Sequence, residues 1–158
     1  MTDAPNKSAP EPAVSDEDFL KQFEMCTWPL EHWHHRQHIK AAYLYLRRWP
    51  FDEAMDRIRQ RIKSYNAAHY LPDLLDSGYH ETMTQAWMRL VHLTLSEYGP
   101  AENADAFYER SPQLWQKKIL RLFYSREVFV TARAKAEFVE ADLTPLPRSS
   151  KSPATPGT

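Results

Sequence analysis

Apolar side chains recur at three- and four-residue steps through almost the whole middle of this chain, which is the spacing of one face of an α-helix. The clearest run lies in 52–69, where Met55, Ile58, Ile62 and Tyr65 fall on one stripe. No stretch alternates with a period of two residues, and only three glycines occur in 158 residues. Sandwiches, Rossmann folds and phosphate loops need more glycine at their turns. The spacing predicts an all-α, bundle-like single domain of about five to seven helices.

Proline, glycine and capping residues mark where the helices should begin and end. Ser15 and Asp18 together resemble a capping box, and Gly78 closes the loop before the fourth long apolar run. The expected helices lie near 15–23, 31–48, 52–69, 80–98, 102–110, 111–123 and 126–138.

Proline is concentrated at the two ends of the chain, together with Ser, Thr, Ala and Lys. Segments of this composition bury too little apolar surface to fold. We therefore expect disordered tails at 1–14 and 144–158 around a helical domain at 15–143. An alternative for the closing segment 138–147 is that it packs back over the domain, in which case the ordered chain ends near Pro147.

Composition excludes several classes of function. The chain has 20 basic and 21 acidic residues and 42% hydrophobic residues. A charge balance of this kind argues against nucleic acid or a membrane surface as a partner. The lone Cys26 excludes a disulfide scaffold and a Cys-rich zinc module. No apolar run approaches the roughly 20 residues of a membrane span, and no secretory leader is evident, so a cytoplasmic location is expected.

Four of the seven histidines lie within seven residues, in the run EHWHHRQHIKAAYLYL. On a helix, His38 shares a face with both His34 and His35. The small pair Ala41 and Ala42 lies about one turn further on and would let a neighbouring helix approach the imidazoles closely. A zinc, copper or non-haem iron site uses such a pair of inward imidazoles and takes its third ligand from elsewhere in the chain.

The best source of a third ligand is the run GYHETMT, which enters the fourth long helix. His80 can complete the set, and Glu81 can serve as a fourth ligand or as an acid–base group next to Tyr79. The resulting hypothesis is a divalent metal, either zinc, iron or copper, held by His35, His38 and His80.

A plainer interpretation stays open. Clustered histidines can form the polar edge of a helix or can bond backbone carbonyls in the core, and His80 can simply cap its helix. We expect His32 and His34 at the surface or outside the ligand set, and His69 and His92 in packing or surface roles.

Two other patterns near the histidines are relevant to function. The alternating cations of 57–63 are expected to form a solvated helix face rather than a nucleic-acid site. Four aromatic residues fall near the histidine faces and could line a largely apolar pocket for a small molecule. They are Trp33, Tyr43, Tyr79 and Trp87.

Five blocks stand out in the chain: W-H-H-R-Q-H-I-K-A-A-Y-x-Y-L (33–46), G-Y-H-E-T-M-T (78–84), S-P-x-L (111–114), Y-S-R-E (124–127) and F-V-E-A-D-L-x-P-L-P (138–147). Together they resemble a family of small, uncharacterised bacterial all-α proteins with similar blocks. The resemblance implies no particular reaction and directs attention to the three predicted ligands and Glu81. This chain departs from the pattern at Ala141, where Pro is usual, and at Trp33, where Phe is usual; neither change removes a ligand.

Two functions from different classes follow. The first is a metal-dependent enzyme acting on a small molecule, in which three imidazoles leave a coordination position open for water, dioxygen or a substrate carbonyl. Glu81, if burial raises its pKa toward neutrality, or Tyr79 would then move protons. The second is a non-catalytic helical protein that binds a ligand or metal or acts as a partner subunit. A homodimer is possible in either case.

Overall fold

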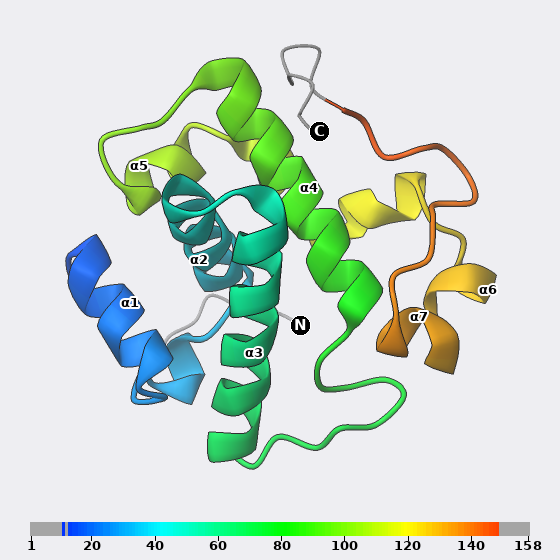
Figure 1. Cartoon of the computed structure of the whole chain (residues 1–158), viewed down its shortest axis with the longest axis horizontal. Helices are drawn as coiled ribbons and strands as arrows, with labels where there is room; N and C mark the ends of the chain where they lie inside the picture. The colour runs from blue at the N-terminus through cyan, green and yellow to red at the C-terminus, as the bar shows by residue number, and fades with distance from the viewer. Residues whose placement is uncertain (1–10, 12, 149–158) are drawn as a thin grey trace.

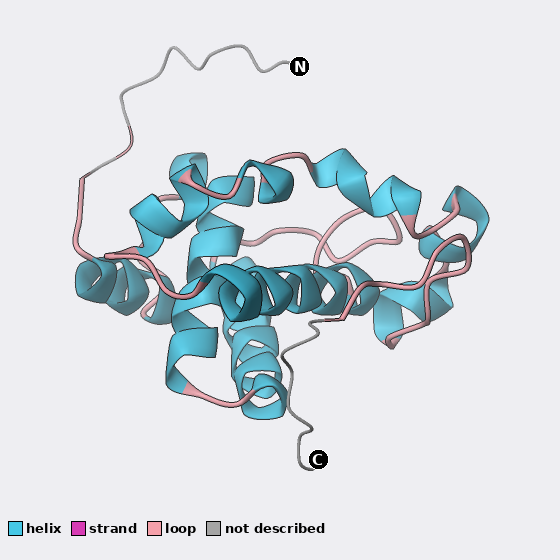
Figure 2. Ribbon diagram, turned by 90° about the horizontal axis from the view of Figure 1, so that it is seen from above, coloured by secondary structure: helices cyan, strands magenta, loops and turns pink. Residues whose placement is uncertain are grey.

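The computed structural model describes residues 11 and 13–148 (Figure 1). Most of the two predicted tails falls outside these residues, so their disorder stays a prediction. Within the described part of the chain every regular element is a helix (Figure 2). The predicted all-α class is therefore confirmed. No helix in this part is both long and apolar enough to cross a membrane.

Short 3₁₀ helices, labelled η, connect the α-helices. In chain order the elements are α1 (Asp16–Glu24), η1 (Leu30–His32), α2 (His35–Arg48), α3 (Phe51–Ala68), α4 (Glu81–Tyr98), α5 (Ala104–Glu109), η2 (Pro112–Leu114), η3 (Lys117–Leu122), α6 (Arg126–Phe129) and α7 (Ala132–Ala136).

The two longest helices match the predicted ranges closely, whereas three predicted helices are interrupted. The run 31–48 breaks before α2 because the Gln37 side chain accepts the His34 backbone N–H at 2.9 Å and starts a new helix there. The run 111–123 forms two 3₁₀ helices instead of one α-helix. The run 126–138 divides because the Thr131 hydroxyl caps a separate helix, α7.

Helix α2 occupies the centre of the domain and contacts α3, α4 and α5. Figure 1 shows α3 in front of it and α4 crossing diagonally beside it. Its side chains are buried on nearly every side, as expected of a core helix. Ala41 and Ala42 are 0% and 3% exposed, so the small pair does lie in the helix packing. The central position of α2 places His35 and His38 partly inside the domain.

The chain after α7 runs back over the helices, as Figure 1 shows in orange. The Tyr124 hydroxyl donates to the Val139 carbonyl at 2.6 Å, and the Leu143 N–H donates to the Phe123 carbonyl at 2.9 Å. Leu146 is 8% exposed and belongs to the hydrophobic core. The packed chain thus reaches beyond residue 143, in agreement with the second expectation for this segment.

Candidate functional site

A cleft of about 1150 Å³ lies among α2, α3 and α4. This volume is large enough for a small organic ligand, since ligand pockets typically enclose about 300–1,000 Å³. Imidazoles and aromatic rings from the starts of α2 and α4 line it, together with apolar side chains of α3. We call it the imidazole cleft. Its lining histidines and rings are His34, His35, His38, His80, Trp33, Tyr79 and Trp87.

Three of the four aromatic residues expected near the histidines do line the imidazole cleft, namely Trp33, Tyr79 and Trp87. The fourth, Tyr43, does not. Its ring stacks on Phe107 at 4.2 Å between centroids, on the side of α2 that faces α5. The sequence placed Tyr43 on the wrong side because helical spacing alone does not tell which neighbour covers each face.

The turn that carries Tyr79 and His80 into the cleft depends on Gly78. Gly78 has a φ of 88°, and a Cβ there would lie 2.9 Å from the Pro72 carbonyl oxygen. Only glycine adopts this conformation at low cost. The Lys135 ammonium then holds the loop, donating to the carbonyls of Ser77 and Tyr79. The sharp entry expected at Gly78 is therefore present.

His80 caps α4, as the plainer interpretation allowed. Its Nδ1 accepts the Met83 backbone N–H at 3.0 Å, and its Nε2 lies 3.1 Å from the Phe129 carbonyl oxygen. Its ring also stacks on Phe129 at 4.6 Å. Because a carbonyl only accepts, Nε2 carries the proton and the ring is neutral. Burial is the main cause that lowers the pKa of His80 and favours this neutral form.

His35 is held in a similar way by a distant part of the chain. Its Nε2 lies 2.7 Å from the Leu114 carbonyl oxygen and donates to it. Trp87 meets the ring edge-on at 4.7 Å. The same contact helps to explain the break after η2, because a carbonyl that bonds His35 is drawn away from a helical acceptor position. Burial lowers the pKa of His35, with a smaller effect of Lys117 in the same direction.

His38 differs from the other two predicted ligands. Its ring lies against Trp33 at 4.2 Å, and it makes no hydrogen bond to any residue in the described part of the chain. Burial, followed by the nearby His35 and Lys117, lowers the pKa of His38 to about 3. His38 is thus a neutral imidazole whose ring nitrogens are open to the cleft.

The three predicted ligands line one cleft but do not form one ligand set. In the described residues, no group of three or more His, Cys, Asp or Glu side chains is placed to hold a metal ion. His80 uses both ring nitrogens in hydrogen bonds, and His35 uses one. A metal at His35, His38 and His80 stays a prediction, and it would require His80 to give up a bond.

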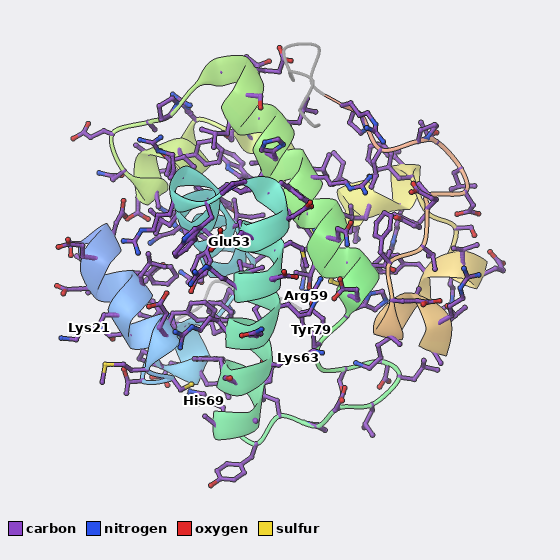
Figure 3. All side chains as sticks on the ribbon, viewed as in Figure 1. Lys21, Glu53, Arg59, Lys63, His69 and Tyr79 are labelled. Carbon is purple, nitrogen blue, oxygen red and sulfur yellow. The ribbon has the colours of Figure 1, made fainter. Side chains whose placement is uncertain are left out.

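Glu81 belongs to a buried ion-pair cluster behind the cleft. The Arg59 guanidinium donates two hydrogen bonds of 2.8 Å to the Glu81 carboxylate, and the Tyr79 hydroxyl donates a third, also of 2.8 Å. The Glu81 side chain is 10% exposed and that of Arg59 is 28% exposed. Figure 3 shows Arg59, Lys63 and Tyr79 along the side of α3 that faces α4. The cluster joins the two helices that form the cleft walls.

A raised pKa was the condition for Glu81 to move protons, and the structure does not meet it. Burial acts to raise this pKa, but the bonds from Arg59 and Tyr79 and the charge of Lys63 outweigh burial and hold the pKa of Glu81 below its usual value. Burial and the neighbouring carboxylate raise the pKa of Tyr79. A carboxylate held ionised and a phenol held protonated are poorly matched to proton transfer near neutral pH. The arrangement supports a structural role for Glu81.

Arg59 is the residue that the sequence reasoning missed. Arg57, Arg61 and Lys63 are exposed, as expected of a solvated face, but Arg59 is partly buried against Glu81. A signal was present in the spacing, since Arg59 is four residues after Met55 and borders the apolar stripe of α3.

The remaining histidines pack as expected. His69 lies 3.0 Å from the Cys26 carbonyl oxygen through Nε2, and His92 lies beside Phe51. His34 is exposed, as expected, and it also lines the cleft just before α2.

The neutral state of His38 leads to a prediction about pH. The pKa of His38 is about 3 in the folded chain and 6.5 ordinarily. Below pH 6.5 the unfolded chain therefore binds a proton at His38 that the folded chain does not, and the free energy of unfolding decreases as the pH is lowered. His38→Gln should remove up to about 1.4 kcal/mol per pH unit of this loss between pH 6.5 and 4.5. Urea unfolding followed by circular dichroism measures it. His32→Gln is the matched control, and equal slopes in both variants would contradict the prediction.

This chain was compared with known proteins in three ways. A search of protein-family models, of curated proteins and of solved structures finds no match to this chain.

Proposed function

We propose that this chain binds a small organic molecule in the imidazole cleft. This is the second of the two functions expected from the sequence. The supporting geometry is a cleft of about 1150 Å³ whose lining combines apolar and aromatic side chains with four imidazoles and several other polar groups. Apolar surface with polar groups that orient a ligand is typical of small-molecule sites. The Trp33 and Trp87 rings offer flat apolar surface to a ligand of that kind.

One observation carries the proposal. His38 faces the cleft as a neutral imidazole without a hydrogen-bond partner among the described residues. Partly buried polar groups of this kind are normally satisfied, by protein, water or a ligand. A ligand that accepts or donates one hydrogen bond at His38, with a ring beside Trp33, would satisfy it. His35 and His80, by contrast, already have carbonyl partners and serve to shape the cleft.

The metal-dependent enzyme remains a second candidate. It is favoured by the position of His35 and His38 about one turn apart on α2, both lining the cleft. Two imidazoles would need a third donor from His80 or from the substrate itself. Titration with Zn²⁺, Fe²⁺ and Cu²⁺, beside a His35→Ala/His38→Ala double variant, separates the candidates. Stoichiometric binding that the double variant abolishes would favour the metal centre.

The test of small-molecule binding uses the neutral dye N-phenyl-1-naphthylamine, whose fluorescence rises in apolar sites. We expect saturable binding of one dye per chain. Met83 lines the cleft and is 38% exposed, so Met83→Trp should fill part of the cleft without disturbing the core. The dissociation constant of the dye should rise about tenfold or more, because displacing the added bulk costs at least about 1.4 kcal/mol.

Leu122→Trp is the matched control for that variant. Leu122 is 62% exposed and lies on η3 outside the cleft lining. The control should bind the dye as the parent does. Absence of dye binding by the parent, or equal binding by both variants, would overturn the proposal.

A further inference from the structure

The imidazole cleft has a single cationic group at its lining, and this group is at the start of η3. Lys117 is the one Lys or Arg among the described residues that line the cleft. It is exposed and forms no ion pair with a described carboxylate. By contrast, the buried Lys40 pairs with Asp105 at 3.0 Å, and Lys135 pairs with Asp73 at 2.9 Å. The charge of Lys117 is therefore not compensated within the domain.

The field of Lys117 reaches the inner end of the cleft. After burial, its charge is a further cause that lowers the pKa of both His35 and His38. Glu31 also lines the cleft, and its charge helps to raise the pKa of Tyr65, after burial and Cys26. The Lys117 charge, by contrast, favours the neutral form of His35 and His38.

Resting on the small-molecule site proposed above, we infer that the occupant is an amphipathic organic anion. Its single acidic group pairs with the Lys117 ammonium, and its apolar body lies along the Trp33 and Trp87 rings. A neutral His38 then donates or accepts a hydrogen bond at the polar end of the body. A single ammonium in a cleft that also holds two indole rings matches a monoanion better than a multiply charged ligand. Carboxylate and sulfonate groups carry the single charge that this pairing requires.

A pair of dyes with the same aromatic core tests the charge directly. The neutral dye is N-phenyl-1-naphthylamine, and the anionic one is 8-anilinonaphthalene-1-sulfonate. In Lys117→Met, which keeps most of the apolar stem, the dissociation constant of the anionic dye should rise about three- to fivefold, while that of the neutral dye stays unchanged. Added salt should weaken the binding of the anionic dye and leave the binding of the neutral dye unchanged.

Lys118→Met is the matched control, because Lys118 is the exposed neighbour of Lys117 on η3 and does not line the cleft. It should leave both dyes unchanged. Displacement of the bound anionic dye by 1-naphthoate, and weaker displacement by the dianion 1-naphthyl phosphate, then tests the preference for a single charge.

The possible failures are distinguishable. If neither dye binds the parent protein, the proposed small-molecule site fails and this inference fails with it. If the neutral dye binds but the anionic dye does not, or if Lys117→Met changes both dyes equally or neither, the site stands and the assignment to an anion is overturned. Thermal unfolding of each variant confirms that the dyes report on folded protein.

Discussion

Replacing Glu81 with Gln is expected to lower the free energy of unfolding by about 2–4 kcal/mol, because it breaks a largely buried ion pair from one side. Arg59 would lose its charged partner and at least one of its two 2.8 Å bonds, because the amide keeps one oxygen acceptor and presents an NH₂ donor in place of the other. The Tyr79 hydroxyl would keep only a neutral acceptor. Arg59 is 28% exposed and also bonds Asp56, so part of its charge stays solvated and the loss should fall short of that for a fully buried pair.

Glu53→Gln is the control for this variant, because Glu53 pairs with Arg57 on the outer face of α3. Both side chains of that pair are nearly half exposed, so its loss should cost no more than about 0.5 kcal/mol. Urea unfolding at pH 7 measures both variants. Equal effects would show that the Glu81 cluster does not stabilise the domain.

The same pair of proteins supplies a check with pH. Because the folded pKa of Glu81 lies below its ordinary value, its contribution is present above the ordinary pKa of 4.5 and is lost as pH falls through the folded value. The difference in stability between the parent and Glu81→Gln should therefore shrink in acid. A difference that stays constant down to pH 3 would contradict the assigned ionisation.

Replacing Trp28 with Ala should cost about 4–5 kcal/mol, within the range for removing a large ring from a packed core. Trp28 is 0% exposed and meets Phe19 edge-on at 4.9 Å. Its indole N–H donates to the His32 carbonyl at 2.9 Å, and its own carbonyl accepts the Tyr65 hydroxyl at 2.7 Å. The loss combines an empty volume with an unpaired carbonyl in η1.

Trp115→Ala provides the comparison, since Trp115 is 44% exposed and lies outside the hydrophobic core. We expect it to cost about 1 kcal/mol. If Trp28→Ala does not fold, Trp28→Phe keeps an aromatic ring in the core and loses the indole N–H bond and part of the ring volume, so its smaller effect should remain measurable. Similar values for Trp28→Ala and Trp115→Ala would contradict the central role of Trp28 in the core.

Trp28 also bears on the imidazole cleft. It ties η1 to the core just before Trp33, whose ring packs on Phe23 and Tyr65 at 4.9 Å each. Trp33 in turn supports His38. A loosened η1 would therefore be expected to weaken dye binding in the cleft as well as the fold.

Much of the architecture was accessible from local sequence signals. The apolar stripe of α3, the proline before it and the glycine turn at Gly78 act over a few residues, and their predictions hold closely. The run 111–123 shows the limit of such signals. Its spacing favours a helix, but the Leu114 carbonyl bonds His35 from another part of the chain, and the segment becomes two 3₁₀ helices.

The sequence by itself determined the helical class, the buried faces and the meeting of histidines with aromatic residues near the start of α2, because helical periodicity is a local property. The tertiary structure decided what each group does. His35, His80 and Glu81 are fixed by partners 79, 49 and 22 residues away in the chain, which no local spacing reveals. Those contacts set the ring tautomers of His35 and His80 and hold Glu81 ionised, whereas the His38 ring forms no hydrogen bond to a described residue.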